Sequence, residues 1–374
     1  MSRSLGHPPF RADHIGSLLR PEKLRRAFRR HATGEISDVE FERIQDECIL
    51  AAVTMQEEIG LSVVTDGEFR RGSYWGRFVE GIAGLEIRPA LLKFRDDRGD
   101  EVDFTAPHAT KPLRYTHPTA LDEFEFLRKT TRVTPKITLP SPSTMHFYRF
   151  SDFADRNAYT DVHLFFADLS AIYRKEIADL VHAGCEYLQL DEVAIALLCD
   201  GAIRDKVSGE GGDPEWLVDC YIDAINAAVR DCGDGLIIGV HMCRGNFRGR
   251  YLGIGSYESI AERFFARTNV NHFLLEYDTP RAGDFAPLRF APKEKAVVLG
   301  LISSKIPALE NMETLERRVE EAAKYIELDR LAISPQCGFA STAAGNPLSE
   351  ADQRAKLQLA VDAARAIWGS VVWR

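Results

Sequence analysis

The sequence has no apolar run of eighteen or more residues, and its first ten residues, MSRSLGHPPF, hold no apolar stretch. A membrane-spanning helix needs about twenty mostly apolar residues, and a secretory signal needs an apolar segment of about 7–15. We therefore expect a cytoplasmic protein with no membrane partner.

The chain also has no excess of basic residues. Lys and Arg number 47 against 56 Asp and Glu, which gives a formal net charge of −9. Nucleic-acid-binding proteins gather Lys and Arg on one face, and this sequence has no such basic block. We expect no nucleic-acid partner.

An even cysteine framework is missing as well. The seven cysteines are an odd number spread over a long chain, which favours free thiols, metal ligands or catalytic groups over disulfides. Simple burial is expected for four that lie in or beside helix-like segments, namely Cys48, Cys199, Cys220 and Cys232.

No repeat, low-complexity tract or linker divides the chain, so we expect one domain over residues 1–374. Short apolar or β-branched runs alternate with segments of helical period, the pattern of parallel βα units. The expected strands are residues 13–17, 61–68, 136–141, 186–192, 236–243, 272–278, 296–304 and 331–337.

Apolar residues recur at three- and four-residue steps between these strands, which predicts helices. They cover residues 38–59, 161–183, 214–231, 255–267, 313–326 and 349–367. Eight alternations predict an α/β fold, a (β/α)8 TIM barrel. Residues 69–135 break the rhythm with aromatic runs and prolines. We expect a hairpin-like insertion there, after the second strand, covering part of the active face.

Polar groups appear at the last positions of the expected strands. The carboxyl ends of barrel strands converge on one face, where active sites are built. The sequence therefore predicts a site assembled from Ser17, Asp66, Glu68, Ser141, Asp191, Glu192, His241, Cys243, Glu276, Asp278, Ser303 and Cys337.

Four of these residues form a ligand set for zinc. His241 and Cys243 are two positions apart at a strand end, so both side chains point the same way. Cys337 and Glu276 end two other strands. One nitrogen, two sulfurs and one oxygen suit a tetrahedral zinc ion. The alternatives are a buried histidine beside an unrelated cysteine, and a structural zinc site.

Six motifs resemble the catalytic barrel of cobalamin-independent methionine synthase, and the resemblance covers nearly the whole chain. They are HIGS at 14–17, DGE at 66–68, QLDE at 189–192, HMC at 241–243, the strand-end Glu276 and PQCG at 335–338. The resemblance implies zinc on His241, Cys243, Glu276 and Cys337, with Glu276 giving way to the thiol of homocysteine. It implies a methyltransferase that forms methionine.

The resemblance also implies an amino-acid pocket. Ile15 and Ser17 would hold the substrate carboxylate, and Glu68 and Asp191 its ammonium group. Two carboxylates facing one desolvated ammonium compensate for the burial of all three charges. The alternatives are that Glu68 pairs with Arg70 or Arg71 and that Asp191 caps the following helix.

The sequence departs from the long enzymes of this family where a folate donor would bind. We expect no counterpart of their amino-terminal barrel, because HIGS occurs almost at the start of the sequence. The segment 139–148 also differs, although Phe147 could still stack on a pterin ring. Lys305 stands where they have a histidine regarded as the acid that assists the leaving amine. A lysine does this only if its pKa is lowered towards neutrality; otherwise Lys305 is an ion-pairing residue.

We expect a methyl donor that is either 5-methyltetrahydrofolate or another methylated compound. An anionic donor could use Arg244, Arg248 and Arg250, which lie in a glycine-rich loop. Two other functions stay open: alkylation of another thiol such as coenzyme M, and a non-catalytic barrel that binds zinc and an amino acid.

Overall fold

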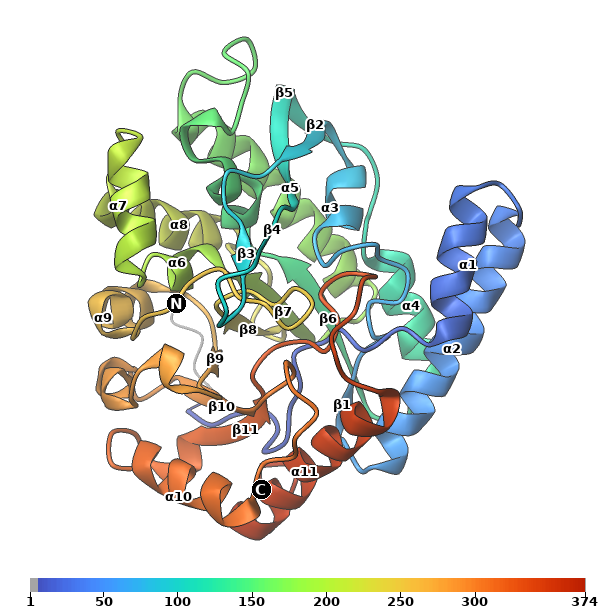
Figure 1. Ribbon diagram of the computed structural model, residues 1–374, viewed down its shortest axis with the longest axis vertical. Coiled ribbons are helices and arrows are strands. Elements are labelled where there is room, and N and C mark those ends of the chain that lie inside the picture. Colours follow the sequence, from blue (N-terminus) through green and yellow to red (C-terminus); the bar gives the residue numbers. More distant parts are fainter. Residues whose placement is uncertain (1–5, 374) are drawn as a thin grey trace.

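The computed structural model describes residues 6–373. Within them, seven strands form one curled parallel sheet in the order β1-β6-β7-β8-β9-β10-β11 (Figure 1). The strands are β1 (Val63–Val64), β6 (Thr134–Pro140), β7 (Tyr187–Glu192), β8 (Ile237–Met242), β9 (His272–Glu276), β10 (Ala296–Ile302) and β11 (Leu331–Pro335). The order follows the sequence, as in a TIM-like barrel.

Helices surround this sheet (Figure 1). The six expected helices are confirmed as α2 (Asp38–Glu58), α5 (Val162–His182), α8 (Pro214–Ala228), α9 (Glu258–Arg267), α10 (Met312–Ala322) and α11 (Glu350–Trp368). Five begin with side-chain caps that satisfy free N–H groups: Ser37 for α2, Asp161 for α5, Asp213 for α8, Asn311 for α10 and Ser349 for α11. Among these described helices, none is long and apolar enough to cross a membrane.

Other helical segments were not expected from the sequence. They are α1 (Glu22–Ala32), α3 (Gly76–Glu80), α4 (Leu121–Thr130), α6 (Ala194–Leu197), α7 (Gly201–Gly209), η1 (Pro142–Met145), η2 (Phe147–Asp152), η3 (Pro280–Ala282), η4 (Ala286–Phe290) and η5 (Leu328–Arg330).

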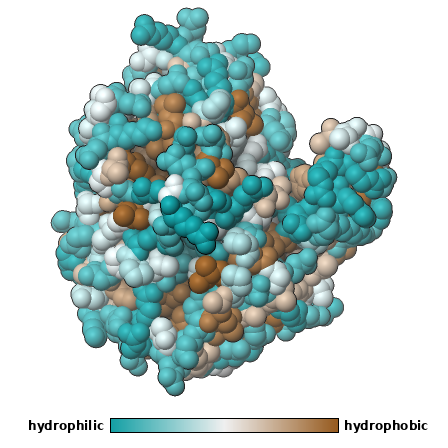
Figure 2. Space-filling model, viewed as in Figure 1, coloured by the Kyte–Doolittle hydropathy of each residue, from teal (hydrophilic) through white to brown (hydrophobic). Residues whose placement is uncertain are grey.

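Figure 2 shows that the projecting α1–α2 lobe is mainly hydrophilic, whereas hydrophobic residues appear in patches near the middle of this face.

The expected strand over residues 13–17 is wrong. Only Ala12 forms a parallel bridge, with Ile333 of β11, and Gly16 has a φ of 130° that breaks extended backbone. Three consecutive carbonyl oxygens accept hydrogen bonds from side chains instead of a neighbouring strand: that of His14 from Lys136, that of Ile15 from Gln189 and that of Gly16 from Thr65.

The stretch 69–135 contains two antiparallel ribbons. One pairs β2 (Ile82–Pro89) with β5 (Thr105–Tyr115), and the other pairs β3 (Phe94–Arg95) with β4 (Glu101–Val102). The helix α4, which closes this stretch, packs on β6 and beside α2 and α5. It therefore belongs with the outer helices, and the ribbons are the part that departs from the βα rhythm.

Candidate active site

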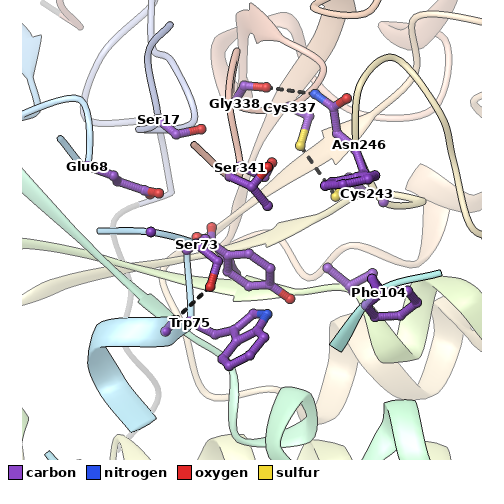
Figure 3. Close-up of a pocket in the computed structure, with 18 of the residues that line it drawn as sticks. Ser17, Glu68, Ser73, Trp75, Phe104, Cys243, Asn246, Cys337, Gly338 and Ser341 are labelled. Carbon is purple, nitrogen blue, oxygen red and sulfur yellow. Dashed lines mark hydrogen bonds between the residues drawn. The ribbon is translucent and has the colours of Figure 1, made fainter. Parts of the chain in front are cut away.

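A cavity of about 450 Å³ lies at the carboxyl ends of the strands. It brings together seven of the residues that the sequence singled out: Ile15, Ser17, Glu68, Asp191, His241, Cys243 and Cys337. In Figure 3, Cys243 and Cys337 lie close together, and Ser17 and Glu68 lie on the other side of the cavity. Residues of the two ribbons, such as Phe94 and Phe104, also line it.

His241, Cys243 and Cys337 form a buried cluster in which the candidate ligand atoms all lie within 4.8 Å of one another. The two Sγ atoms are 3.5 Å apart. A tetrahedral zinc ion with Zn–S bonds of about 2.3 Å separates its sulfur ligands by about 3.8 Å, so the spacing fits this metal.

The orientation of His241 also fits a metal ligand. Its Nδ1 lies 3.1 Å from the carbonyl oxygen of Leu274, and because a carbonyl only accepts, Nδ1 carries the hydrogen. The buried Nε2 has no hydrogen-bond partner. A carbonyl that fixes the tautomer in this way leaves the lone pair of the other ring nitrogen free for a metal.

The pKa values of the two cysteines are shifted in opposite directions. The hydrogen bond with Cys243 holds the pKa of Cys337 well below its usual range, against the opposing effect of burial, and nearby His241 lowers it further. The same hydrogen bond and burial raise the pKa of Cys243 well above its usual range. The two shifts are opposite in direction because the Sγ atoms of Cys337 and Cys243 share one hydrogen bond. Burial alone would lower the pKa of His241, but Cys337 outweighs it and the pKa is raised.

Glu276 and Lys305 form a buried ion pair beside this cluster. Lys305 Nζ lies 3.8 Å from Glu276 Oε1, and neither atom has a hydrogen-bond partner. The other oxygen, Oε2, accepts a hydrogen bond of 2.9 Å from the backbone N–H of Arg244. Burial would raise the pKa of Glu276, but Lys305 and Arg244 outweigh it, and the pKa is lowered.

A lysine can act as the acid at the leaving nitrogen only if its pKa is lowered towards neutrality, and Lys305 does not meet this condition. Burial would lower its pKa, but the carboxylates of Glu276 and Asp278 outweigh burial and the pKa is raised above its ordinary value. The ion pair with Glu276 is thus the observed arrangement, and the acid role stays a prediction.

Arg244 is not available to an anionic donor, and that expectation is wrong. Its side chain is fully buried and donates to the carbonyl of Gly255 at 3.1 Å and to the hydroxyl of Tyr257 at 2.9 Å. Its backbone meanwhile holds Glu276. Arg250 pairs with Asp96 at 3.3 Å.

Glu68 presents one free carboxylate oxygen. Its Oε1 accepts a hydrogen bond of 2.8 Å from Thr138 and lies 3.7 Å from Arg71, while Oε2 is buried without a partner. Arg71 makes its closer ion pair, of 2.6 Å, with Glu123. Glu68 adopts a φ of 59°, which is uncommon for a residue with a side chain and typical of strained functional positions.

Asp191 does not cap the following helix. Its Oδ1 accepts a hydrogen bond of 2.7 Å from Gln189, whereas Glu192 accepts from the backbone N–H of Ile195 in α6. Burial raises the pKa of Asp191 to about 7. The group thus titrates near neutrality and gains from a cationic partner.

Ser17 reaches the cavity because of a glycine opposite. A Cβ on Gly338 would lie only 2.0 Å from Ser17 Oγ, so no other residue fits there without movement. The backbone N–H of Phe339 donates to the Ser17 carbonyl at 2.8 Å and links this turn to the Cys337 segment.

Aromatic residues that the sequence did not single out line the cavity. They are Tyr74, Trp75, Phe94, Phe104, Tyr148 and Phe247. Phe147 instead is fully buried and packs edge-on against Phe150 and Tyr221, so it is not available to stack on a ligand. The aromatic runs within residues 69–135 were the one signal in the sequence for these aromatic lining residues.

Residues 10–366 match the family described as the catalytic domain of cobalamin-independent synthase. The uncharacterised protein YxjH of Bacillus subtilis is 42% identical over 364 residues, which cover 96% of this chain and 95% of YxjH. Methionine synthase of Pyrococcus horikoshii is 27% identical over 328 residues, covering 87% of this chain and 85% of that protein.

A crystal structure shows the same architecture. It is that of a Listeria monocytogenes protein thought to be a vitamin-B12-independent methionine synthase. Its TM-score is 0.75 at 30% sequence identity, covering 97% of this chain and 99% of that chain.

Proposed function

The chain belongs to the family of the cobalamin-independent synthase catalytic domain, and from that membership we propose that it methylates homocysteine to methionine. It is a methionine synthase-like methyltransferase, and the proposal concerns its thiol, its metal and its donor. The donor is 5-methyltetrahydrofolate or another methylated compound. The observation that carries the proposal is the buried cluster of His241, Cys243 and Cys337 in one cavity with Glu68 and Asp191.

The proposed metal is zinc, held by His241 Nε2, the two cysteine sulfurs and the carboxylate of Glu276. When bound, zinc favours the deprotonated form of a coordinated thiol, whose ordinary pKa is about 8.5. The unpartnered Nε2 of His241 and the lowered pKa values of Cys337 and Glu276 support this set, because metal ligands bind deprotonated.

Glu276 is the proposed exchangeable ligand. Lys305 is the proposed ion-pair partner of its carboxylate when that carboxylate is not bound to the metal. Arg244 holds one Glu276 oxygen, and Lys305 lies 3.8 Å from the other. These partners would stabilise the Glu276 carboxylate if it gave up its place on the metal to the substrate thiol.

The amino-acid part of the substrate is bound by four residues. The free Oε2 of Glu68 and the carboxylate of Asp191 accept its ammonium hydrogens, and the turn at Ile15 and Ser17 faces its carboxylate. The apolar walls exclude water from the sulfur and the methyl carbon.

We propose that residues 1–374 act as one domain and that the segment around residues 11–18 closes a (β/α)8 barrel. The Asp13 N–H donates to the Ile333 carbonyl on one side, and the Leu18 N–H to the Gly67 carbonyl on the other. The two ribbons are then the insertion after the second strand.

The two other functions are less well supported. Glu68 and Asp191 would repel the sulfonate of coenzyme M, which argues against that thiol. A non-catalytic barrel conflicts with membership of a methyltransferase family.

The test is methionine formation from homocysteine by the zinc-loaded protein with a panel of methyl donors. We expect methionine with at least one donor, loss of turnover when a chelator removes zinc, and recovery when zinc is restored. Cys337→Ser should abolish both zinc retention and turnover, whereas Cys220→Ser, on the outer helix α8, should change neither. Methionine formed equally well without zinc, or with no donor at all, would overturn the proposal.

A further inference from the structure

The lining of the cavity has an unusual charge balance. Among the described residues, no lysine or arginine lines it, whereas four carboxylates do: Glu68, Glu80, Asp103 and Asp191. Glu68 and Asp191 are assigned above to the ammonium group of the amino acid. The remaining two lie at the open side, where Glu80 is exposed and Asp103 is 84% exposed and 3.4 Å from Lys93.

The rest of the open side is a continuous aromatic wall. The ring centroids of Phe247 and Phe94 are 5.3 Å apart, those of Phe94 and Phe104 4.9 Å, and those of Phe104 and Tyr148 5.1 Å. The hydroxyl of Tyr148 lies 3.0 Å from that of Tyr74. In Figure 3, Trp75 and Phe104 lie in the part of the cavity below Glu68 and the cysteines.

Such a lining discriminates among donors by charge. A polyanion is bound in proteins by arginine and lysine side chains, and none of these is among the described residues that line the cavity, whereas the carboxylates that do line it disfavour a polyanion. An alkylated cation is attracted to the faces of aromatic rings, which bind quaternary ammonium groups in many proteins.

We propose that the methyl donor is a methyl-onium cation, a sulfonium or a quaternary ammonium compound, bound against the aromatic wall formed by Tyr74, Trp75, Phe94, Phe104, Tyr148 and Phe247. This inference rests on the proposed function, because it takes the methyl acceptor to be the homocysteine thiol.

The chemistry balances without a further reactant. The acceptor sulfur forms a bond to the methyl carbon, and the bond from that carbon to the positive sulfur or nitrogen breaks. Its electron pair stays on the leaving atom, which departs as a neutral thioether or amine. The thiol proton goes to solvent. No acid is needed at the leaving group, unlike the reaction of a neutral methylated amine.

The first experiment supplies the zinc-loaded protein and homocysteine with four donors: trimethylsulfonium, tetramethylammonium, and 5-methyltetrahydrofolate as its mono- and triglutamate. We expect methionine from at least one cation, in equal amount to the dimethyl sulfide or trimethylamine released. Which cation works identifies the sulfonium or the ammonium class. Turnover with a folate and with neither cation would overturn the inference.

The variant Phe104→Leu keeps an apolar side chain and removes the ring. We expect the KM for the cation to rise about three- to thirtyfold, the range of a cation–π contact, with the KM for homocysteine unchanged. Phe126→Leu replaces a half-buried ring of α4 that does not line the cavity, and it should leave both constants unchanged. Equal effects of the two variants would contradict the inference.

A second measurement needs no variant. Choline and its neutral carbon analogue 3,3-dimethylbutanol have the same shape, so competition by each against the donor isolates the charge. Choline should compete at least threefold better, and equal competition would overturn the inference. A thermal shift with homocysteine alone separates the two proposals, because it reports the thiol site whatever the donor. A shift with no turnover from either cation overturns the donor class alone, whereas no shift and no methionine overturn both.

Discussion

Two buried lysine–carboxylate pairs lie inside this sheet, and they are built differently. Lys136, at the start of β6, donates to Asp13 at 2.7 Å, to Gln189 at 3.1 Å and to the His14 carbonyl. Lys305, just after β10, lies 3.8 Å from Glu276 and makes no hydrogen bond through Nζ. Both lysines are almost fully buried.

The difference separates a structural pair from a functional one. A buried ammonium group is tolerated when its three hydrogens find acceptors, and Lys136 has all three. Leaving a buried charge incompletely bonded costs stability, so the Glu276–Lys305 pair is poorly explained by folding alone. The two atoms of this pair that lack a hydrogen-bond partner, Lys305 Nζ and Glu276 Oε1, are at the end of the sheet where the candidate zinc ligands lie.

The largest effect is expected from breaking the structural pair. Lys136→Met leaves Asp13 buried without its cation and should lower the free energy of unfolding by about 3–5 kcal/mol. Urea unfolding at neutral pH measures this loss. The zinc content of the folded fraction should be unchanged. A loss below about 1 kcal/mol would show that the network is not structural.

The next effect concerns pH and distinguishes two buried aspartates. Burial would raise the pKa of Asp13, but Lys136 outweighs it and the pKa is lowered. Burial raises the pKa of Asp66 to about 7, and Glu123 adds to this. Asp13 therefore stabilises the fold above the unfolded pKa of about 4 and loses this contribution as the pH falls. Asp66 has the opposite sign, because the unfolded chain releases its proton first between about pH 4 and pH 7.

Asp66→Asn removes the dependence of the unfolding free energy on the titration of Asp66. As the pH rises from 5 to 8, we expect the unfolding free energy of the wild-type protein to fall by about 2–3 kcal/mol more than that of the variant. Asp234→Asn, at an exposed position, provides the matched control. Parallel pH curves for the wild type and Asp66→Asn would contradict the assignment.

Breaking the functional pair should affect substrate more than stability. In the zinc-loaded protein, Lys305→Met removes the partner that receives displaced Glu276, so homocysteine binding should weaken about ten- to a hundredfold while zinc retention stays unchanged. Lys305→Arg should restore part of the affinity. A fall in kcat at unchanged KM for homocysteine would instead support Lys305 as the acid.

The smallest effect is expected at Gln189, which contacts both the structural lysine Lys136 and the cavity residue Asp191. Gln189 accepts from Lys136, so its amide nitrogen faces Asp191 and the Ile15 carbonyl, at 2.7 and 2.6 Å. Gln189→Glu cannot donate, and it should raise the KM for homocysteine about three- to tenfold. The kcat should change less than twofold. An unchanged KM would mean that Asp191 is positioned without this contact.

The sequence predicted those features that depend on periodicity and strand ends. Seven of the eight expected strands and six of the helices are present, and residues as far apart as Glu68 and Cys337 line one cavity. Topology alone brings them together, because parallel strands share one carboxyl edge.

The features it missed depend on side-chain partners distant in sequence. Residues 13–17 alternate like a strand, but lysine, glutamine and threonine side chains from three other segments take their carbonyls. Arg244 looks free in a loop, yet Gly255 and Tyr257 hold it inside. Phe104 follows β4 and is partly exposed beside the cavity, whereas Phe147 is buried against Phe150 and Tyr221.

Zinc X-ray absorption of the metal-loaded protein, with and without homocysteine, tests the central claim most directly. The account predicts two sulfur, one nitrogen and one oxygen ligand without the amino acid, from the two cysteines, His241 and Glu276. With homocysteine it predicts three sulfurs and one nitrogen, the oxygen having been lost. A coordination sphere that keeps its oxygen and two sulfurs at saturating homocysteine would contradict the account.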